Sequence, residues 1–293
     1  MSEVVWHNGR VLSRQESLIS AYDHGFLYGD SIYETIRTSG GVPFLLDRHL
    51  RRLRRSAAAI QMVLDRDDAE YRDAIKETLQ AAANPESAIR IVVTRGIGDI
   101  GYGIHLCPER QTLIYVRPLR RLRDPRFRRG LHLAILDIRR NDKRAVSPTI
   151  KSGNLLNNIL GAFEAEKRGA DEGILLNQEG YVAEGTMTNV FLVAQGVIRT
   201  PPAAVGILEG ITRGFVLEVA RENHMPVEES AFRPDDLLQA DEIFVTSTTK
   251  GILPVLSING QPVGQNAPGP VTLKLTALFD KAEDDLVHLA TPG

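Results

Sequence analysis

The stretch SPTIKSGNLLNNIL, residues 147–160, places one lysine in an unusual setting. Lysines and arginines together number 35, yet only seven of these residues are lysines. Apart from Lys151, most of the lysines lie in charge-rich segments. Lys151 instead follows an apolar, proline-containing approach and precedes Ser-Gly and an asparagine-rich apolar helix. An ammonium there is poorly hydrated, so its pKa falls and the free amine can attack a carbonyl carbon. Lys151 is therefore a candidate for covalent chemistry, with a salt-bridged structural lysine as the alternative.

The composition is ordinary for a soluble globular protein. The 293 residues are 43% hydrophobic and 25% charged, with a net charge of −2, which gives no reason to expect nucleic acid or an anionic membrane as a partner. A single cysteine, Cys107, excludes an intrachain disulfide. The seven histidines contain no i, i+4 pair, so we expect no metal site. No signal-peptide pattern or membrane-length apolar run is present, so we expect a cytoplasmic protein.

The pattern of turns and periodic segments predicts an α+β protein with two domains. We expect a smaller N-terminal α/β domain at residues 1–120, with hairpins at the Asn-Gly and Gly-Gly turns and helices over about 47–62 and 69–83. An arginine-rich segment, 121–129, is interpreted as an interdomain linker. A larger β-rich C-terminal domain, 130–293, would carry Lys151 and contain helices at GITRGFVLEVARE and VTLKLTALFDKAEDDL.

Six segments occur in one order and at one spacing. They are YDHGFLYGDSIYETIR (22–37), IRIVVTRGIGDIGYG (89–103), IKSGNLLNNIL (150–160), GYVAEGTMTNVFLV (180–193), LEGITRGF (208–215) and FVTSTTKGILPV (244–255). Together they resemble the fold-type IV aminotransferases that depend on pyridoxal 5'-phosphate, the family of branched-chain and D-amino-acid aminotransferases. The resemblance runs from about Val4 to about residue 280. It implies transfer of an amino group between a 2-amino acid, of D or branched-chain L type, or a chiral amine, and a 2-oxo acid such as 2-oxoglutarate.

The resemblance assigns Lys151 and Glu184 the central roles. Lys151 would hold the cofactor through a Schiff base and then move the proton between the substrate and the cofactor. Glu184 lies in a strand that is otherwise apolar, where a carboxylate is unfavourable unless a cation meets it. The matching glutamate of the family pairs with the pyridine nitrogen, whereas the residues alone also allow an exposed strand glutamate.

The phosphate is expected at the segment GITRGF, where the first turn of a helix offers unpaired N–H groups to an anion. An ordinary capping threonine is the alternative. By resemblance, Ile211 and Thr212 supply backbone donors, Thr248 supplies a hydroxyl and Arg52 supplies a guanidinium. Helical periodicity by itself disagrees at Arg52, because it places this side chain on the polar, solvent-facing side of its helix.

The resemblance also implies a substrate pocket and a homodimer. Tyr28 and Tyr33 match aromatic positions beside the substrate, and Arg90 matches an arginine that meets the distal carboxylate of glutamate or 2-oxoglutarate. Tyr102 and Ile104 match a glycine-rich loop that reaches into the site of the neighbouring subunit. Thr248 and Thr249 should lie near the substrate carboxylate.

Three positions depart from the branched-chain enzymes. Ala88 and Leu155 stand where those enzymes usually carry tyrosines, which weakens the case for a standard branched-chain L-amino acid. Leu155 is closer to the D-amino-acid enzymes, but their Arg-and-His carboxylate trap is not evident in the loop 98–105. Lys250 adds an ammonium after Thr249 that either binds the substrate carboxylate or points to water.

Two other classes remain as alternatives. A lyase of the aminodeoxychorismate type uses the same fold and lysine to eliminate pyruvate, although its pattern around Lys151 is absent here. A catalytically silent relative that only binds ligands is also consistent with the fold. The joint presence of Lys151, Glu184 and Thr212 argues against the silent protein.

Overall fold

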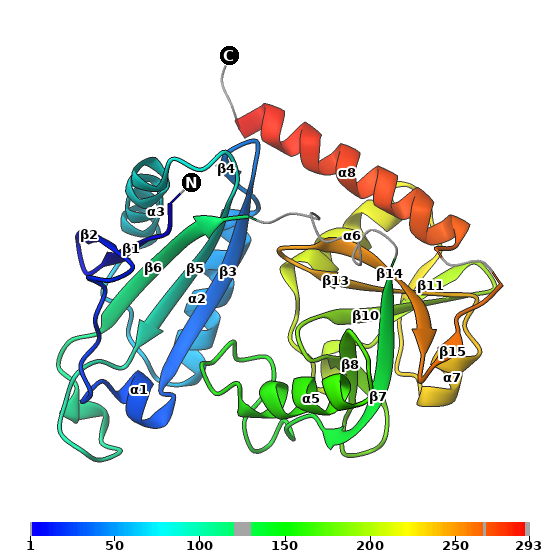
Figure 1. Ribbon diagram of the computed structural model, residues 1–293, viewed down its shortest axis with the longest axis horizontal. Helices are drawn as coiled ribbons and strands as arrows, with labels where there is room; N and C mark the ends of the chain where they lie inside the picture. Colours follow the sequence, from blue (N-terminus) through cyan, green and yellow to red (C-terminus); the bar gives the residue numbers. More distant parts are fainter. Residues whose placement is uncertain (1, 120–129, 266–267, 291–293) are drawn as a thin grey trace. The chain divides into compact units, whose positions relative to one another are not determined.

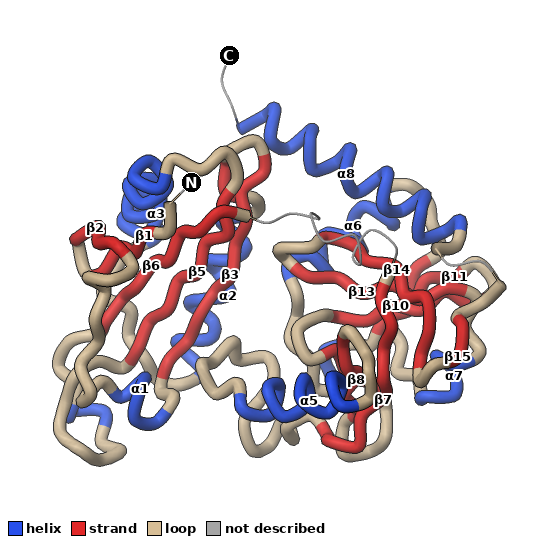
Figure 2. The backbone as a smooth tube through the Cα atoms, viewed as in Figure 1, coloured by secondary structure: helices blue, strands red, loops and turns tan. Residues whose placement is uncertain are grey.

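The computed structural model describes residues 2–119, 130–265 and 268–290 (Figures 1 and 2). These residues form two compact units: unit 1 holds Met1–Arg120, Ile150–Asn154 and Val287–Gly293, and unit 2 holds Arg121–Thr149 and Leu155–Leu286. The expected linker at 121–129 lies outside the described residues. Lys151 groups with unit 1, which differs from the expectation that the C-terminal domain carries it.

Backbone pairing explains why the Lys151 segment belongs to unit 1. The Tyr33 N–H donates to the Lys151 carbonyl at 2.9 Å, and the Gly153 N–H donates to the Ser31 carbonyl at 2.8 Å. This approach requires glycine at position 153, because a Cβ there would lie 2.1 Å from the Ser31 Oγ. The Lys151 segment is thus tied to a strand that lies far from it in the sequence.

Unit 1 is built on an antiparallel sheet of six strands, in the order β2-β1-β6-β5-β3-β4. The predicted Asn-Gly hairpin is confirmed, since Asn8 and Gly9 both have positive φ, as a tight turn between twisted strands requires. The strands are β1 (Val4–His7), β2 (Arg10–Ser13), β3 (Ser31–Ser39), β4 (Val42–Pro43), β5 (Ser87–Thr94) and β6 (Gln111–Pro118).

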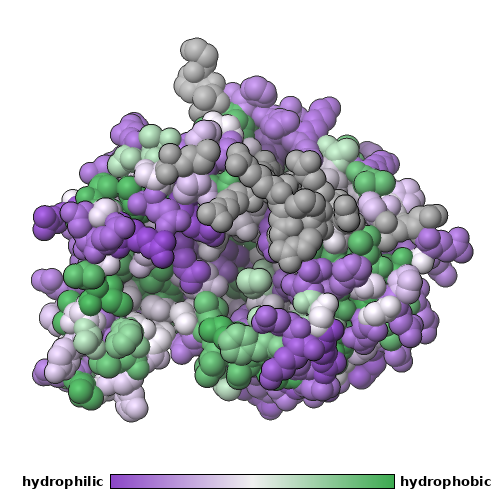
Figure 3. Space-filling model, in the orientation of Figure 1, coloured by the Kyte–Doolittle hydropathy of each residue, from purple (hydrophilic) through white to green (hydrophobic). Residues whose placement is uncertain are grey.

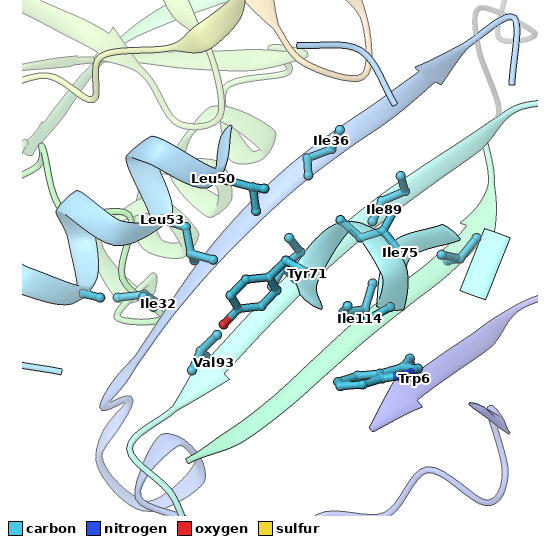
Figure 4. Packing of buried hydrophobic residues seen from close by; sticks show 14 of the residues in the cluster. Trp6, Ile32, Ile36, Leu50, Leu53, Tyr71, Ile75, Ile89, Val93 and Ile114 are labelled. Carbon is cyan, nitrogen blue, oxygen red and sulfur yellow. The ribbon is translucent and has the colours of Figure 1, made fainter. Parts of the chain in front are cut away.

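Helices α2 (Leu46–Ala59) and α3 (Asp68–Ala82) cover one face of this sheet, and their apolar side chains meet the strands in the core of the unit (Figure 4). α3 begins with a capping box between Asp67 and Glu70. Short helices α1 (His24–Tyr28) and η1 (Ile104–Leu106) complete the unit.

Arg90 lies on the face of the unit 1 sheet that points away from the hydrophobic core. Ile89 and Ile91 point into the core, so Arg90, which lies between them on β5, points to the other face. Register places Arg90 opposite Thr35 on β3 and Tyr115 on β6. The alternation of β5 therefore separates Arg90 from the hydrophobic core.

Unit 2 contains a mixed sheet in the order β12-β11-β10-β13-β14-β7-β8-β9, with β15 paired to β14. Its strands are β7 (Leu131–Arg139), β8 (Glu172–Leu176), β9 (Val182–Gly185), β10 (Asn189–Ala194), β11 (Val197–Thr200), β12 (Val227–Glu229), β13 (Glu242–Ser247), β14 (Gly251–Ile258) and β15 (Gln261–Pro262). A tight turn joins β9 to β10, where the Gly185 N–H donates to the Thr188 carbonyl at 2.8 Å. The sheet curls, and its core includes stacked rings of Phe191 and Phe244.

The helices of unit 2 are α5 (Leu156–Lys167), η2 (Ala203–Val205), α6 (Ile211–Glu222), α7 (Pro234–Leu238) and α8 (Pro270–Ala290), whose last residues belong to unit 1. Among the described residues, no helix is both long and apolar enough to cross a membrane. The predicted helices at GITRGFVLEVARE and VTLKLTALFDKAEDDL are confirmed as α6 and α8.

Candidate active site

In unit 1, the Lys151 amine lies against an aromatic ring. Its Nζ is 4.5 Å from the centroid of Tyr33, and its backbone N–H donates to the Ser56 Oγ at 3.1 Å. Burial lowers the pKa of Lys151; Tyr33 opposes the shift, partly through a hydrogen bond, and the nearby Arg52 guanidinium adds to it. A lowered pKa increases the fraction of free amine, which is the nucleophilic form.

A buried ion pair lies beside this amine. The Arg52 Nε and Nη2 donate to the two carboxylate oxygens of Glu34 at 2.7 and 2.8 Å, and the His49 Nδ1 lies 2.7 Å from the Glu34 Oε2. Burial alone would raise the pKa of Glu34, but the Arg52 charge and the hydrogen bonds from Arg52 and His49 lower it to about 2. Burial lowers the pKa of His49, although Glu34 opposes that shift, so His49 acts as a neutral donor.

The solvent-facing position that periodicity predicts for Arg52 is wrong, because the residue is only 4% exposed. The buried face of α2 is wider than its apolar stripe and also includes His49, Arg52 and Ser56. Glu34 and His49 were missed by the sequence analysis. The signal for Glu34 was present, since a carboxylate inside the apolar strand SIYETIR requires a cation.

Arg90 is exposed and stacks on the ring of Tyr33, with its Cζ 4.0 Å from the ring centroid. Lys151 contacts the same ring, so Arg90 and the amine are separated by no more than those two distances together. A four- or five-carbon dicarboxylic acid can span such a separation.

The predicted residues Tyr28, Tyr102 and Ile104 form a separate surface of unit 1. The Tyr28 hydroxyl accepts from the Gly101 N–H at 3.1 Å, and its ring packs edge-on against Tyr102 at 5.3 Å. Tyr102 is 91% exposed and Ile104 is 47% exposed. The glycine-rich loop therefore presents apolar side chains outward.

In unit 2, Glu184 is 5% exposed, so the alternative of an exposed strand residue is wrong. The Arg140 Nε donates to its Oε1 at 2.8 Å, while its Oε2 accepts from the Leu208 N–H at 3.0 Å and the Asn189 Nδ2 at 3.4 Å. Arg140 supplies the cation that the buried strand requires. The sequence analysis missed Arg140 because it lies in the charged run RRNDKR.

The first turn of α6 and the end of β13 offer donors suited to a phosphate. α6 begins at Ile211, its N-cap Gly210 has no side-chain cap, and Thr212 is buried. A Cβ at Gly210 would lie 2.0 Å from the Asn189 Oδ1, so glycine permits the approach. The buried hydroxyls of Thr246 and Ser247, just before Thr248, have no partner within the described part of the chain. A helix N-terminus beside unpartnered hydroxyls fits an anionic group.

Thr248, Thr249 and Lys250 form the turn between β13 and β14 and are partly buried. Lys250 lies close enough to Glu172 to oppose the shift in that residue's pKa, which burial raises above its usual range. Glu172 is 2% exposed, and its Oε1 accepts from the Thr186 Oγ1 and the Met187 N–H. Lys250 is thus next to a buried carboxylate in addition to the threonines.

The family described as amino-transferase class IV matches residues 31–258 of this chain. The chain belongs to this family. The putative branched-chain-amino-acid aminotransferase of Methanocaldococcus jannaschii is 36% identical over 275 residues, which cover 94% of each chain. The D-alanine aminotransferase of Bacillus licheniformis is 39% identical over 270 residues, covering 92% of this chain and 93% of the relative.

A solved structure of the branched-chain amino acid aminotransferase from Thermobaculum terrenum, in its PLP-containing holo form, matches this class IV aminotransferase with a TM-score of 0.85. The two are 29% identical, and the match covers 96% of this chain and 93% of the other. The resemblance and the two-sheet α+β fold are confirmed, and this class IV aminotransferase is a transaminase that depends on pyridoxal phosphate. An aminodeoxychorismate lyase of Bacillus subtilis is 31% identical over 287 residues, which gives the lyase alternative weaker support.

The ion pair at Glu34 predicts acid sensitivity. Because the folded-state pKa of Glu34 is about 2 rather than 4.5, its contribution to stability is present above pH 4.5 and is lost as the pH falls toward 2. The difference in unfolding free energy between wild type and Glu34→Gln should therefore shrink over this range, by on the order of 3 kcal/mol. Urea unfolding at several pH values measures it.

A matched control is Asp142→Asn. Arg144 lowers the pKa of Asp142 to about 2 as well, but this pair lies at the surface, where solvent screens the charges. Asp142→Asn should therefore change the acid profile of the wild type much less than Glu34→Gln does. A Glu34→Gln profile parallel to that of the wild type would contradict the assigned role of the buried pair.

Proposed function

We propose that this aminotransferase exchanges amino groups between a 2-amino acid, of D or branched-chain L type, and a 2-oxo acid, with Lys151 as its catalytic amine. The observation that carries the proposal is the desolvated Lys151 amine, held against Tyr33 beside the Glu34–Arg52 pair. Family membership supports the reaction class, and relatives named for branched-chain amino acids and for D-alanine support the two substrate types.

The chemistry supplied by pyridoxal phosphate is that of an electron sink for the pair released at the substrate α-carbon. Lys151 would hold the cofactor through its Nζ, and the same amine, when free, would accept the proton of the substrate α-carbon at Nζ. Tyr33 orients the amine through its hydrogen bond and ring. Lys151 would thus carry out the proton transfer that defines transamination, and Tyr33 would position it.

The remaining residues bind and orient. Glu184, held by Arg140, accepts a hydrogen bond from the pyridine nitrogen and favours its protonated form. Ile211 and Thr212 offer first-turn N–H groups to the phosphate, with the Thr248 hydroxyl and the Arg52 guanidinium as further donors. Tyr33 and Arg90, which contact each other in unit 1, bind the substrate in this proposal. A cytoplasmic location stays a prediction of the sequence.

The test of the function is a covalent label. Borohydride reduction of the holoenzyme followed by peptide mapping should place the cofactor on Lys151. Lys151→Ala should bind pyridoxal phosphate without a covalent bond and lose the half-reaction with amino acids, followed by absorbance. Lys250→Ala is the matched control, because Lys250 is the other lysine near the candidate site; a label on Lys250 would refute the proposal.

A second prediction concerns the acceptor. If Arg90 meets a distal carboxylate, Arg90→Ala should lower kcat/KM for 2-oxoglutarate by about one to two orders of magnitude, since a charged hydrogen bond contributes roughly 1.5 to 3 kcal/mol. The value for pyruvate, which has no distal carboxylate, should hardly change. Arg117→Ala is the control, because register places Arg117 on the same sheet face, opposite Ala88. Equal losses with both acceptors would mean that Arg90 supports Tyr33 rather than the substrate.

We further propose that the enzyme is a homodimer whose second copy covers apolar surfaces present on each unit. In unit 1, Ile100 and Tyr102 of the glycine-rich loop are 73% and 91% exposed, and Phe26 on α1 is 65% exposed. In unit 2, Leu156 and Phe163 of α5 are 65% and 55% exposed, and hydrophobic surface is visible in this region (Figure 3). Apolar surfaces of this kind mark association sites.

Sedimentation equilibrium tests the dimer. The expected mass is twice that of the 32.3 kDa chain. Phe163→Ser should weaken association because it removes apolar area from the exposed face of α5, whereas Val63→Ser, which alters an exposed valine outside these surfaces, should not. A monomer at micromolar concentration would contradict the proposal.

A further inference from the structure

The asparagine pair in the segment NLLNNIL has a structural role that the catalytic assignments above do not use. Asn157 and Asn158 are the second and third residues of α5. Asparagine is a poor helix former, and its amide usually serves as a cap or in a turn. Leu155 occupies the N-cap instead, without a side-chain cap. The two amides are therefore available to other elements.

Both amides reach the end of β7 and the turn after β9. The Asn157 Nδ2 donates to the Arg139 carbonyl at 2.8 Å, and the Asn158 Nδ2 donates to the Thr186 carbonyl at 2.7 Å. These bonds orient both amide groups, so that each Oδ1 faces the same guanidinium. The Arg140 Nη1 donates to the Asn157 Oδ1 at 3.1 Å and to the Asn158 Oδ1 at 3.3 Å.

The same guanidinium holds Glu184. Its Nε donates to the Glu184 Oε1 at 2.8 Å, and both residues are more than nine-tenths buried. Because a guanidinium is planar, fixing Nη1 from α5 also fixes the direction of the Nε–H bond toward the carboxylate. The Leu208 N–H donates to the other carboxylate oxygen of Glu184, Oε2, so both oxygens are held in place.

We propose that Asn157 and Asn158 are positioning residues for amino transfer: they hold Arg140, and Arg140 holds the Glu184 carboxylate in the orientation that meets the pyridine nitrogen. The inference rests on the proposed function, in which Glu184 binds that nitrogen. Neutral amides suit this role, because a carboxylate at either position would compete with Glu184 for the guanidinium. The two amides orient the guanidinium without neutralising its charge, so Glu184 remains its counterion.

The main variant replaces both asparagines by alanine. Alanine is a better helix former, so α5 should persist while the bonds to Arg140 are lost. We expect Asn157→Ala/Asn158→Ala to bind pyridoxal phosphate about tenfold more weakly, as loss of hydrogen bonds to a charged group predicts. The pH midpoint of the absorbance change of the bound cofactor should also shift. Asn223→Ala, which removes an amide that donates to the Val219 carbonyl of its own helix, is the control.

A cofactor-free measurement separates positioning from folding. The thermal midpoint of the apoenzyme should stay within a few degrees of the wild type. In the ¹H–¹⁵N spectrum of the apoenzyme, the Arg140 Nε–H signal, identified by its loss in Arg140→Lys, should shift in the double variant. An unshifted signal, or unchanged cofactor affinity, would overturn the inference.

A double-mutant cycle tests whether the asparagines act through Arg140. Lysine keeps the charge but lacks the planar fork, so Arg140→Lys cannot bind Glu184 and both amides in the same way. In that background, the alanine substitutions should cause little further loss of cofactor affinity. A second, additive tenfold loss would mean that the asparagines only tether α5, which contradicts the proposal.

Glu184→Gln distinguishes a failure of the proposed role of Glu184 from a failure of the proposed role of the two asparagines. If this variant keeps near-native turnover, the role of Glu184 in the proposed function fails, and the inference fails with it. If Glu184→Gln is impaired while the double asparagine variant matches the wild type, the proposed function stands and only the role of the asparagines is overturned.

Discussion

The pairing of a buried carboxylate with a guanidinium is the constraint on which the candidate active site depends, and each unit contains such a pair. Glu34 meets Arg52 in unit 1, and Glu184 meets Arg140 in unit 2. A charge cannot be buried without compensation, and removal of one partner from a buried pair costs about 3 to 5 kcal/mol. The side chains around each pair are therefore fixed in position before a ligand arrives.

In unit 1, this constraint sets the environment of Lys151. Burial and the Arg52 charge lower the pKa of the amine, whereas Tyr33 and the Glu34 charge raise it. Glu34 already accepts hydrogen bonds from Arg52 and His49. Its charge therefore raises the pKa of Lys151 by less than burial lowers it. Arg52, whose charge lowers the pKa of the amine, also links α2 to β3 through its bonds to Glu34.

Several features followed from the local sequence. Strand alternation, the Asn-Gly hairpin and the helices α2, α3, α6 and α8 were predicted because hydrophobic period and turn chemistry are local. Lys151 and Glu184 were singled out because each is a polar group in an apolar setting, and Glu184 is buried beside a cation. By contrast, Arg52 was placed on the wrong side of its helix by periodicity, because the cation that Glu34 requires lies outside the hydrophobic pattern.

The sequence by itself determined the family and singled out Lys151 and Glu184 as candidate site residues, because the residue types and their spacing carry that information. Only the tertiary structure decided which partners these groups have. Arg140, from a charged run, donates to Glu184 and also to Asn157, from an apolar helix, through contacts between residues distant in the chain. Such contacts depend on strand register and on the placement of helices, and no local pattern encodes them.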